Sequence, residues 1–201
     1  MAVQLINMKC SGCGETLSPS MSECPSCGNA VVFSSFNSIL KRTEQDLGKL
    51  ARKLENDPDA NSPEMGNMVK FTLASCYLKL RLYDKALAKF EAAIEENLDN
   101  PETYFYAAVS LLKGKKACLT PMTNIRKALE YLDAATDIEP RGVFYFFKAY
   151  LKYDFFARKY LQVTPDYKAE LRQAIANNLS PFDAEELFSI LGVECPAALA
   201  I

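Results

Sequence analysis

The chain has 201 residues, of which 49% are hydrophobic, and this suits one or two domains with a substantial core. Its net charge of −2 gives no global basic field that would attract nucleic acid or anionic lipid. It contains no histidine, which excludes Ser-His-Asp and Cys-His catalysis and every metal site that needs an imidazole. We therefore expect a protein that is not an enzyme.

The first nine residues, Met1 to Lys9, lack the charged and apolar regions of a secretory signal. No stretch approaches the roughly 18 consecutive apolar residues of a transmembrane helix. These features predict a cytoplasmic protein that does not enter the membrane. In that compartment, closely paired cysteines are more often metal ligands than disulfides.

Four cysteines near the N-terminus form the pattern C-x2-C-x10-C-x2-C, and a glycine follows each pair. They are Cys10, Cys13, Cys24 and Cys27. Two such pairs can place four thiolates around one ion in a tetrahedron, as structural zinc requires, with rubredoxin-like iron as the alternative. The glycines, Gly14 and Gly28, suit the positive φ angle that each turn needs. A site with four cysteine ligands is closed, so we expect structural Zn²⁺.

The two cysteine motifs read Met-Lys-Cys-Ser-Gly-Cys-Gly and Glu-Cys-Pro-Ser-Cys-Gly. Over residues 8–30 they resemble the zinc-ribbon modules found at the N-termini of bacterial proteins. The resemblance implies a small β domain over residues 1–33, with short strands between the cysteine pairs and a further strand at 31–33. So small a module needs its metal, because about 30 residues cannot bury enough surface to fold alone.

Helical patterns begin after the cysteine module and continue to the end of the chain. Residues 36–58 predict an amphipathic connecting helix that ends near Asp57-Pro58, and its apolar face contains Phe36, Leu40, Leu47, Leu50 and Leu54. Residues 181–201 predict a C-terminal capping helix and tail. Ser180 is its expected N-cap, Pro181 its first residue and Gly192 its terminator.

Residues 62–180 contain an internal repeat. Leu73, Ala74 and Tyr77 recur 34 residues later as Ala107, Ala108 and Leu111. In the next helix, Ala86, Phe90 and Ala93 recur after 42 residues as Ala128, Leu132 and Ala135, which predicts eight inserted residues within 113–123. The 34-residue period and these positions resemble the tetratricopeptide repeat (TPR). The resemblance implies a mostly α fold: a TPR-like α-solenoid of helix-turn-helix repeats, preceded by the β zinc ribbon.

Residues 143–161 are rich in aromatic side chains, and lysines recur along one stripe. One interpretation is an aromatic-walled groove with a basic rim that holds an acidic or C-terminal peptide. The other is a central helix whose lysines extend to water from a buried stem. On the first interpretation, the candidate partner-binding residues are Arg141, Lys148, Lys152, Tyr145 and Tyr104.

These observations together predict a non-enzymatic intracellular adaptor or scaffold that binds a protein or peptide partner through its TPR-like groove. The alternative is a nucleic-acid- or ribosome-associated protein that binds through its zinc ribbon. Residues 1–35 contain one basic residue, Lys9, whereas neutralising phosphates takes several. We therefore expect a protein partner rather than a nucleic acid.

Overall fold

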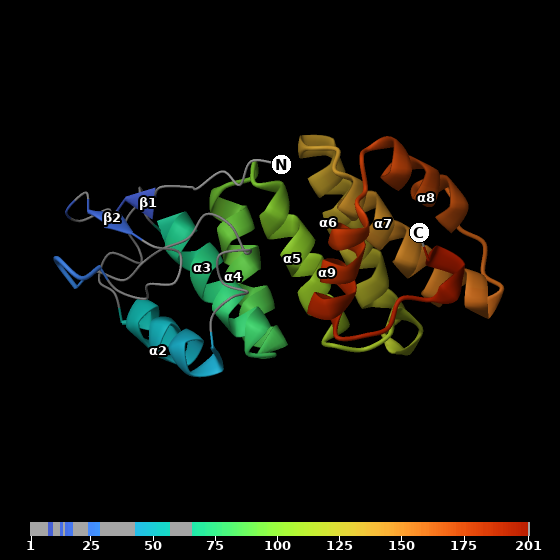
Figure 1. The fold of residues 1–201 in the computed structure, drawn as a ribbon. Coiled ribbons are helices and arrows are strands. Elements are labelled where there is room, and N and C mark those ends of the chain that lie inside the picture. The colour runs from blue at the N-terminus through green and yellow to red at the C-terminus, as the bar shows by residue number, and fades with distance from the viewer. Residues whose placement is uncertain are drawn as a thin grey trace. The chain divides into compact units, whose positions relative to one another are not determined.

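The computed structural model describes residues 8–9, 13, 15–17, 24–28, 43–56 and 66–200. Its described residues are predominantly α-helical, as predicted (Figure 1). The chain divides into two compact units, Met1–Leu82 and Tyr83–Ile201. The boundary falls inside the first predicted repeat, between its two helices. None of the helices in the described part of the chain combines the length and apolarity needed to cross a bilayer.

The first unit begins with two short strands, β1 (Met8–Lys9) and β2 (Thr16–Leu17). They pair antiparallel, with Met8 opposite Leu17 and Lys9 opposite Thr16. β1 precedes the first cysteine pair in the sequence, and β2 lies between the two pairs, where strands were expected. The strand expected at 31–33 lies outside the described residues.

Two helices follow in the first unit, α2 (Glu44–Glu55) and α3 (Gly66–Lys79), and they pack together. Thr43 caps α2 by accepting a hydrogen bond from the Asp46 amide. The predicted apolar face of the connecting helix is confirmed at Leu47, Leu50 and Leu54, which are buried. The positions Phe36 and Leu40 lie outside the described residues.

The described residues of the second unit form six α-helices, which are α4 (Tyr83–Glu96), α5 (Pro101–Leu112), α6 (Met122–Ile138), α7 (Gly142–Leu151), α8 (Tyr167–Ala176) and α9 (Pro181–Leu191). The connections between α5 and α6 and between α7 and α8 are longer than the others. From α4 to α8 each helix packs on the next along the chain. Small side chains permit this close packing. The repeated alanines are all buried: Ala86, Ala93, Ala107, Ala108, Ala128 and Ala135.

A loop joins α5 to α6 at the place where the sequence predicts inserted residues. Its short 3₁₀ turn, η2 (Ala117–Leu119), is fixed by α7 and the segment that follows it. The Ala117 amide donates to the Tyr150 hydroxyl at 3.2 Å, and the Cys118 amide donates to Asp154 at 2.8 Å. Asp154 is buried within a π-helical segment, η3 (Lys152–Phe156), and also accepts a hydrogen bond from Arg158. The insertion is therefore tied to the helical unit.

The first residue of α7, Gly142, lies against the end of α8. Its amide donates to the Asn177 carbonyl at 3.0 Å. A Cβ atom at this position would come within 2.5 Å of the Leu179 nitrogen and 2.7 Å of the Ala174 carbonyl oxygen. Only glycine allows this approach of the two backbones.

The predicted boundaries of the last helix are confirmed. Ser180 and Asp183 form a capping box, Pro181 occupies the first turn, and Gly192 ends α9 with φ of 67°. The chain then turns into a short 3₁₀ segment, η5 (Ala197–Leu199), whose Leu199 is fully buried.

Candidate functional site

Three cysteine sulfur atoms meet in the first unit. The Sγ atoms of Cys13, Cys24 and Cys27 all lie within 4.8 Å of one another, and those of Cys13 and Cys24 are 3.6 Å apart. Two thiolates at about 2.3 Å from a tetrahedral zinc ion are separated by about 3.8 Å, whereas a disulfide requires about 2.05 Å. The cluster therefore has the spacing of metal ligands. Cys10, the fourth predicted ligand, lies outside the described residues.

The second cysteine pair owes its geometry to a tight turn. The Gly28 amide donates to the Cys24 carbonyl at 2.9 Å, and Gly28 has φ of 72°, as the sequence predicts. Pro25 occupies the second position of this turn, where its fixed φ is favourable. The turn brings the sulfur atoms of Cys24 and Cys27 onto the same side.

Two further contacts join this turn to its surroundings. Ser26 donates to the Glu15 carboxylate at 3.2 Å, which links the two cysteine pairs, and Lys53 of α2 donates to the Gly28 carbonyl. Cys24 is 2% exposed, while Cys13 and Cys27 are exposed. The donor set, at least three thiolates in one place, suits a soft or borderline metal ion and fits the expectation of a bound metal.

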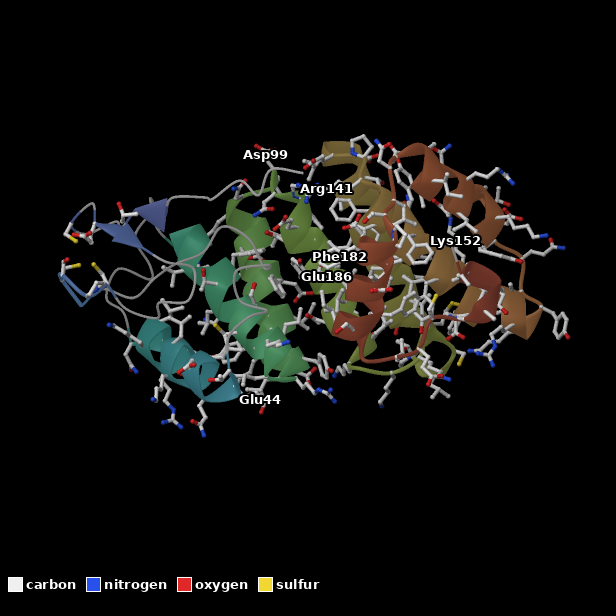
Figure 2. All side chains as sticks on the ribbon, in the orientation of Figure 1. Glu44, Asp99, Arg141, Lys152, Phe182 and Glu186 are labelled. Carbon is white, nitrogen blue, oxygen red and sulfur yellow. The ribbon has the colours of Figure 1, made fainter. Side chains whose placement is uncertain are left out.

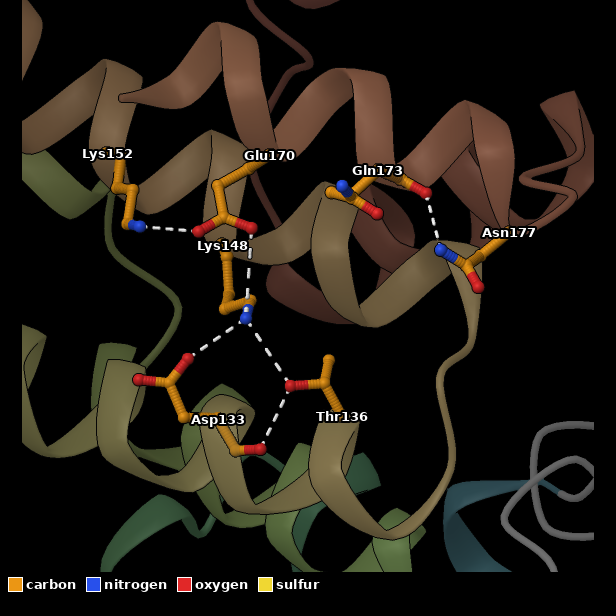
Figure 3. A network of polar contacts seen from close by, with 7 residues as sticks. All are labelled: Asp133, Thr136, Lys148, Lys152, Glu170, Gln173 and Asn177. Carbon is orange, nitrogen blue, oxygen red and sulfur yellow. Dashed lines mark hydrogen bonds and ion pairs between the residues drawn. The ribbon is translucent and has the colours of Figure 1, made fainter. Parts of the chain in front are cut away.

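Two lysines of the predicted stripe, Lys148 and Lys152, lie in the interior of the second unit and share one carboxylate (Figure 3), whereas the third, Lys159, is exposed. Lys152 donates to Glu170 of α8 at 2.5 Å. Lys148 donates to Asp133 of α6 at 2.9 Å, lies 3.4 Å from the Thr136 hydroxyl, and is 3.7 Å from the other oxygen of Glu170. The network thus connects α6, α7 and α8.

Burial of these charges is possible because they are balanced. Lys148 and Lys152 are each 6% exposed and Glu170 is 3% exposed. An unpaired ammonium group in such a place would be strongly unfavourable, but Glu170 lies close to both lysines, and Asp133, whose side chain is 63% exposed, balances the second charge from the surface. The central-helix interpretation expected these lysines to extend to water, and the groove interpretation expected them at an exposed rim. Lys148 and Lys152 do neither.

The aromatic residues around them belong to the core, which favours a helix surrounded on all sides over an aromatic-walled groove. Those with at most 8% exposure are Phe144, Phe146, Phe147, Tyr150, Phe155 and Phe156. Their rings pack on neighbouring helices. The rings of Phe105 and Phe144, for example, have centroids 5.1 Å apart.

The remaining candidate partner-binding residues are placed as follows. Arg141 donates to Glu102 at 3.0 Å and to Glu139 at 2.7 Å. Tyr145 is half-buried under the Lys148 ammonium, and Tyr104 is 8% exposed and packs edge-on against a ring of α6. Tyr104 lies in α5, Tyr145 and Lys148 lie in α7, and Arg141 and Lys152 flank the two ends of α7. Internal pairing occupies the charged groups. Their role in partner binding stays a prediction.

Arg141 lies in the same part of the unit as several carboxylates (Figure 2). Burial raises the pKa of Tyr106 well above its usual value, with Glu102 and Glu186 adding to the rise and Arg141 opposing it. The pKa of Glu186 is also raised, chiefly by burial and then by Asp183 and Glu102. Glu102 of α5 and Glu186 of α9 thus both act on Tyr106, while Arg141, at the start of α7, pairs with Glu102.

An open groove of about 710 Å³ runs beside α9 in the second unit. Its floor is made by Phe146 of α7 and Phe188 of α9, whose rings meet edge to face with centroids 5.9 Å apart. Leu199 of η5 also lines the groove. Ser189 of α9 lines it as well and is exposed. The volume is within the range of about 300–1,000 Å³ typical of ligand sites.

Sequence reasoning missed both Glu170 and the groove. Two lysines four residues apart in an apolar helix signal a buried carboxylate partner, because charges are almost never buried unpaired. Glu170 lies four residues before Ala174, which is fully buried on α8. Residues four apart share one helix face, so this spacing places Glu170 on the buried face. The groove gives no local signal, since it depends on how the tail folds back.

Comparison of the chain with protein-family models gives no match, and comparisons with curated proteins and with solved structures give no significant match.

Proposed function

We propose that this protein is a non-enzymatic adaptor that binds a segment of a partner protein in the groove beside α9. The observation that carries the proposal is that groove itself, an open, largely apolar surface bounded by Phe146, Phe188 and Leu199. Apolar concave surfaces are the usual sites at which helical proteins hold peptides. A chain without histidine gives no support to acid–base or nucleophilic chemistry there.

The second part of the proposal concerns architecture. The α-helices act as TPR-like repeats, which is supported by the sequential packing from α4 to α8 and by the buried alanines at repeated positions. The cysteine cluster acts as a zinc ribbon with Cys10 as its fourth ligand, supported by the sulfur spacing and the glycine turn at Gly28. The zinc is structural, because four cysteine ligands leave no position for substrate.

Filling the groove tests the adaptor function. In the full-length protein, Ser189→Trp places a large ring on the exposed groove wall, and Gln173→Trp places the same ring on the exposed surface of α8. We expect affinity capture from a cell extract to recover a partner with the wild type and with Gln173→Trp, and to lose it with Ser189→Trp at unchanged melting temperature. Equal recovery with all three proteins would contradict the proposal.

A further inference from the structure

The inner surface of the groove is apolar and rigid. Phe146 and Leu199 are fully buried and Phe188 is 6% exposed, so the floor is fixed by packing. The ring of Phe188 also packs edge-on against Tyr150, with centroids 5.1 Å apart. Above this floor the groove leaves Pro181, Ala184 and Val193 accessible, so a partner meets a preformed apolar surface and binding need not order the floor.

The rim of the groove is acidic. Two exposed carboxylates, Glu185 and Glu194, line it, and its lining residues in the described part of the chain include no lysine or arginine. The whole stretch from residue 180 to 200 adds Asp183 and Glu186 and contains no basic residue. Within the described part of the chain, neither Glu185 nor Glu194 forms an ion pair. Their charges are thus available to a ligand.

The length of the groove indicates an elongated occupant. Its lining follows α9, which has 11 residues and is therefore about 16 Å long. An extended peptide would need partners for its backbone amides and carbonyls, and the groove lining offers it no strand edge. A helix satisfies its own backbone and presents one apolar face over about three turns.

From these three features we propose that the groove binds an amphipathic helix of a partner protein, with lysine or arginine residues flanking its apolar face. The apolar face packs on the accessible apolar lining, Pro181, Ala184 and Val193, and the basic residues pair with Glu185 and Glu194. This inference rests on the proposed function and adds to it the chemistry of the partner. Rim charges mainly determine which helix binds and how fast.

The test uses a yeast-displayed library of helices with leucine and alanine on one face and random residues beside that face. The baits are the full-length wild type, the double variant Glu185→Lys/Glu194→Lys, and Ser189→Trp. A double variant on exposed sites elsewhere in the second unit, Glu95→Lys/Glu130→Lys, is the matched charge control.

With the wild type, we expect lysine and arginine to be enriched about twofold to fivefold at the random positions, as exposed ion pairs of this kind allow. The control double variant keeps that preference, and the groove double variant reverses it toward aspartate and glutamate. An unchanged preference in the groove double variant, or acidic enrichment with the wild type, overturns the inference.

The third bait separates this inference from the proposed function. If Ser189→Trp stops selection while charge reversal has no effect, the groove binds helices but not through its carboxylates, and only the inference fails. If Ser189→Trp selects helices as well as the wild type does, the groove itself is not the binding surface and both fail. Sedimentation that shows a dimer abolished by Ser189→Trp assigns the groove to a second copy and overturns the inference.

Discussion

Residues 8–28 and the second unit differ in what their side chains can bury. Among the described residues of the cysteine segment whose side chains are placed, Cys24 is the buried one, and the others are exposed. In the second unit, large rings such as Phe90, Phe147 and Tyr150 are at most 1% exposed. Burying such a side chain contributes about 1.5–3 kcal/mol, and the placed side chains of the cysteine segment provide no such burial apart from Cys24.

The difference shows two routes to an ordered structure within one chain. The helical unit draws its stability from apolar packing and can accommodate a balanced buried charge network. On the proposed function, the cysteine segment instead depends on the metal that its thiolates bind, because a structural metal contributes folding free energy directly. Changes to the metal ligands and changes to the core should therefore have separate consequences.

Loss of a metal ligand should have the largest effect and should be confined to the first unit. We expect Cys24→Ser to remove a bound metal whose apparent contribution is about 10–16 kcal/mol in small zinc modules. Elemental analysis should fall from one metal per chain to none, while the thermal melting of the helices by circular dichroism changes little. The exposed Cys195, changed to serine, is the control and should keep the metal. Equal metal content in both variants would contradict the assignment of Cys24 as a metal ligand.

Removing the shared carboxylate should have the next largest effect, now in the second unit. Glu170→Gln leaves Lys152 buried without its ion-pair partner, and we expect a loss of about 3–5 kcal/mol in the free energy of unfolding. Denaturant titration measures it, with the exposed Glu130→Gln as a control of the same chemistry. The additional change Lys152→Met should recover part of the loss. A change below about 1 kcal/mol in Glu170→Gln would show that the network does not hold α8.

Adding one carbon atom between α7 and α8 should destabilise the second unit by about 1–3 kcal/mol. The new Cβ of Gly142→Ala would meet backbone atoms at 2.5 and 2.7 Å, which cannot move without shifting a helix. The same substitution at Gly48 in α2 meets nothing within 4 Å and should stabilise the protein by about 0.5–1 kcal/mol. Opposite signs in denaturant titration support close packing at Gly142, and equal signs contradict it.

The smallest expected effect is that of Glu186→Gln. Burial, Asp183 and Glu102 raise the pKa of Glu186, so the folded state binds this proton more tightly than the unfolded state does. The charged carboxylate therefore costs stability above its raised pKa, and the cost disappears as the pH falls below the unfolded value.

Glu186→Gln should thus raise the melting temperature at pH 7. The corresponding gain in the free energy of unfolding is less than about 1 kcal/mol because the group is partly exposed. The gain should shrink toward pH 4. Glu185→Gln, on the exposed side of the same helix, is the control. A gain that does not depend on pH would contradict this assignment.

The local features of the fold could be predicted from the sequence because each depends on neighbouring residues. The caps of α9 at Ser180 and Gly192, the buried leucines of α2 and the turn at Gly28 follow from short patterns. The spacing of the cysteines likewise indicates the sulfur cluster. Such features need no knowledge of which helices meet.

The features that sequence reasoning misplaced depend on contacts between distant segments. A stripe of lysines looks the same whether its partner is water or a carboxylate on another helix, and Glu170 lies 18 residues beyond Lys152. The groove requires Leu199 to return beside Phe146 and Phe188. Helical periodicity gives the face on which a residue lies but does not identify what covers that face.

Hydrogen exchange of the full-length protein with and without EDTA tests the central claim most directly. If a metal orders the cysteine segment and packing orders the helices, chelation should accelerate exchange in peptides that contain residues 13 and 24–28 and leave those from 83–200 unchanged. Unaltered exchange in the cysteine peptides, or acceleration throughout residues 83–200, would contradict the account.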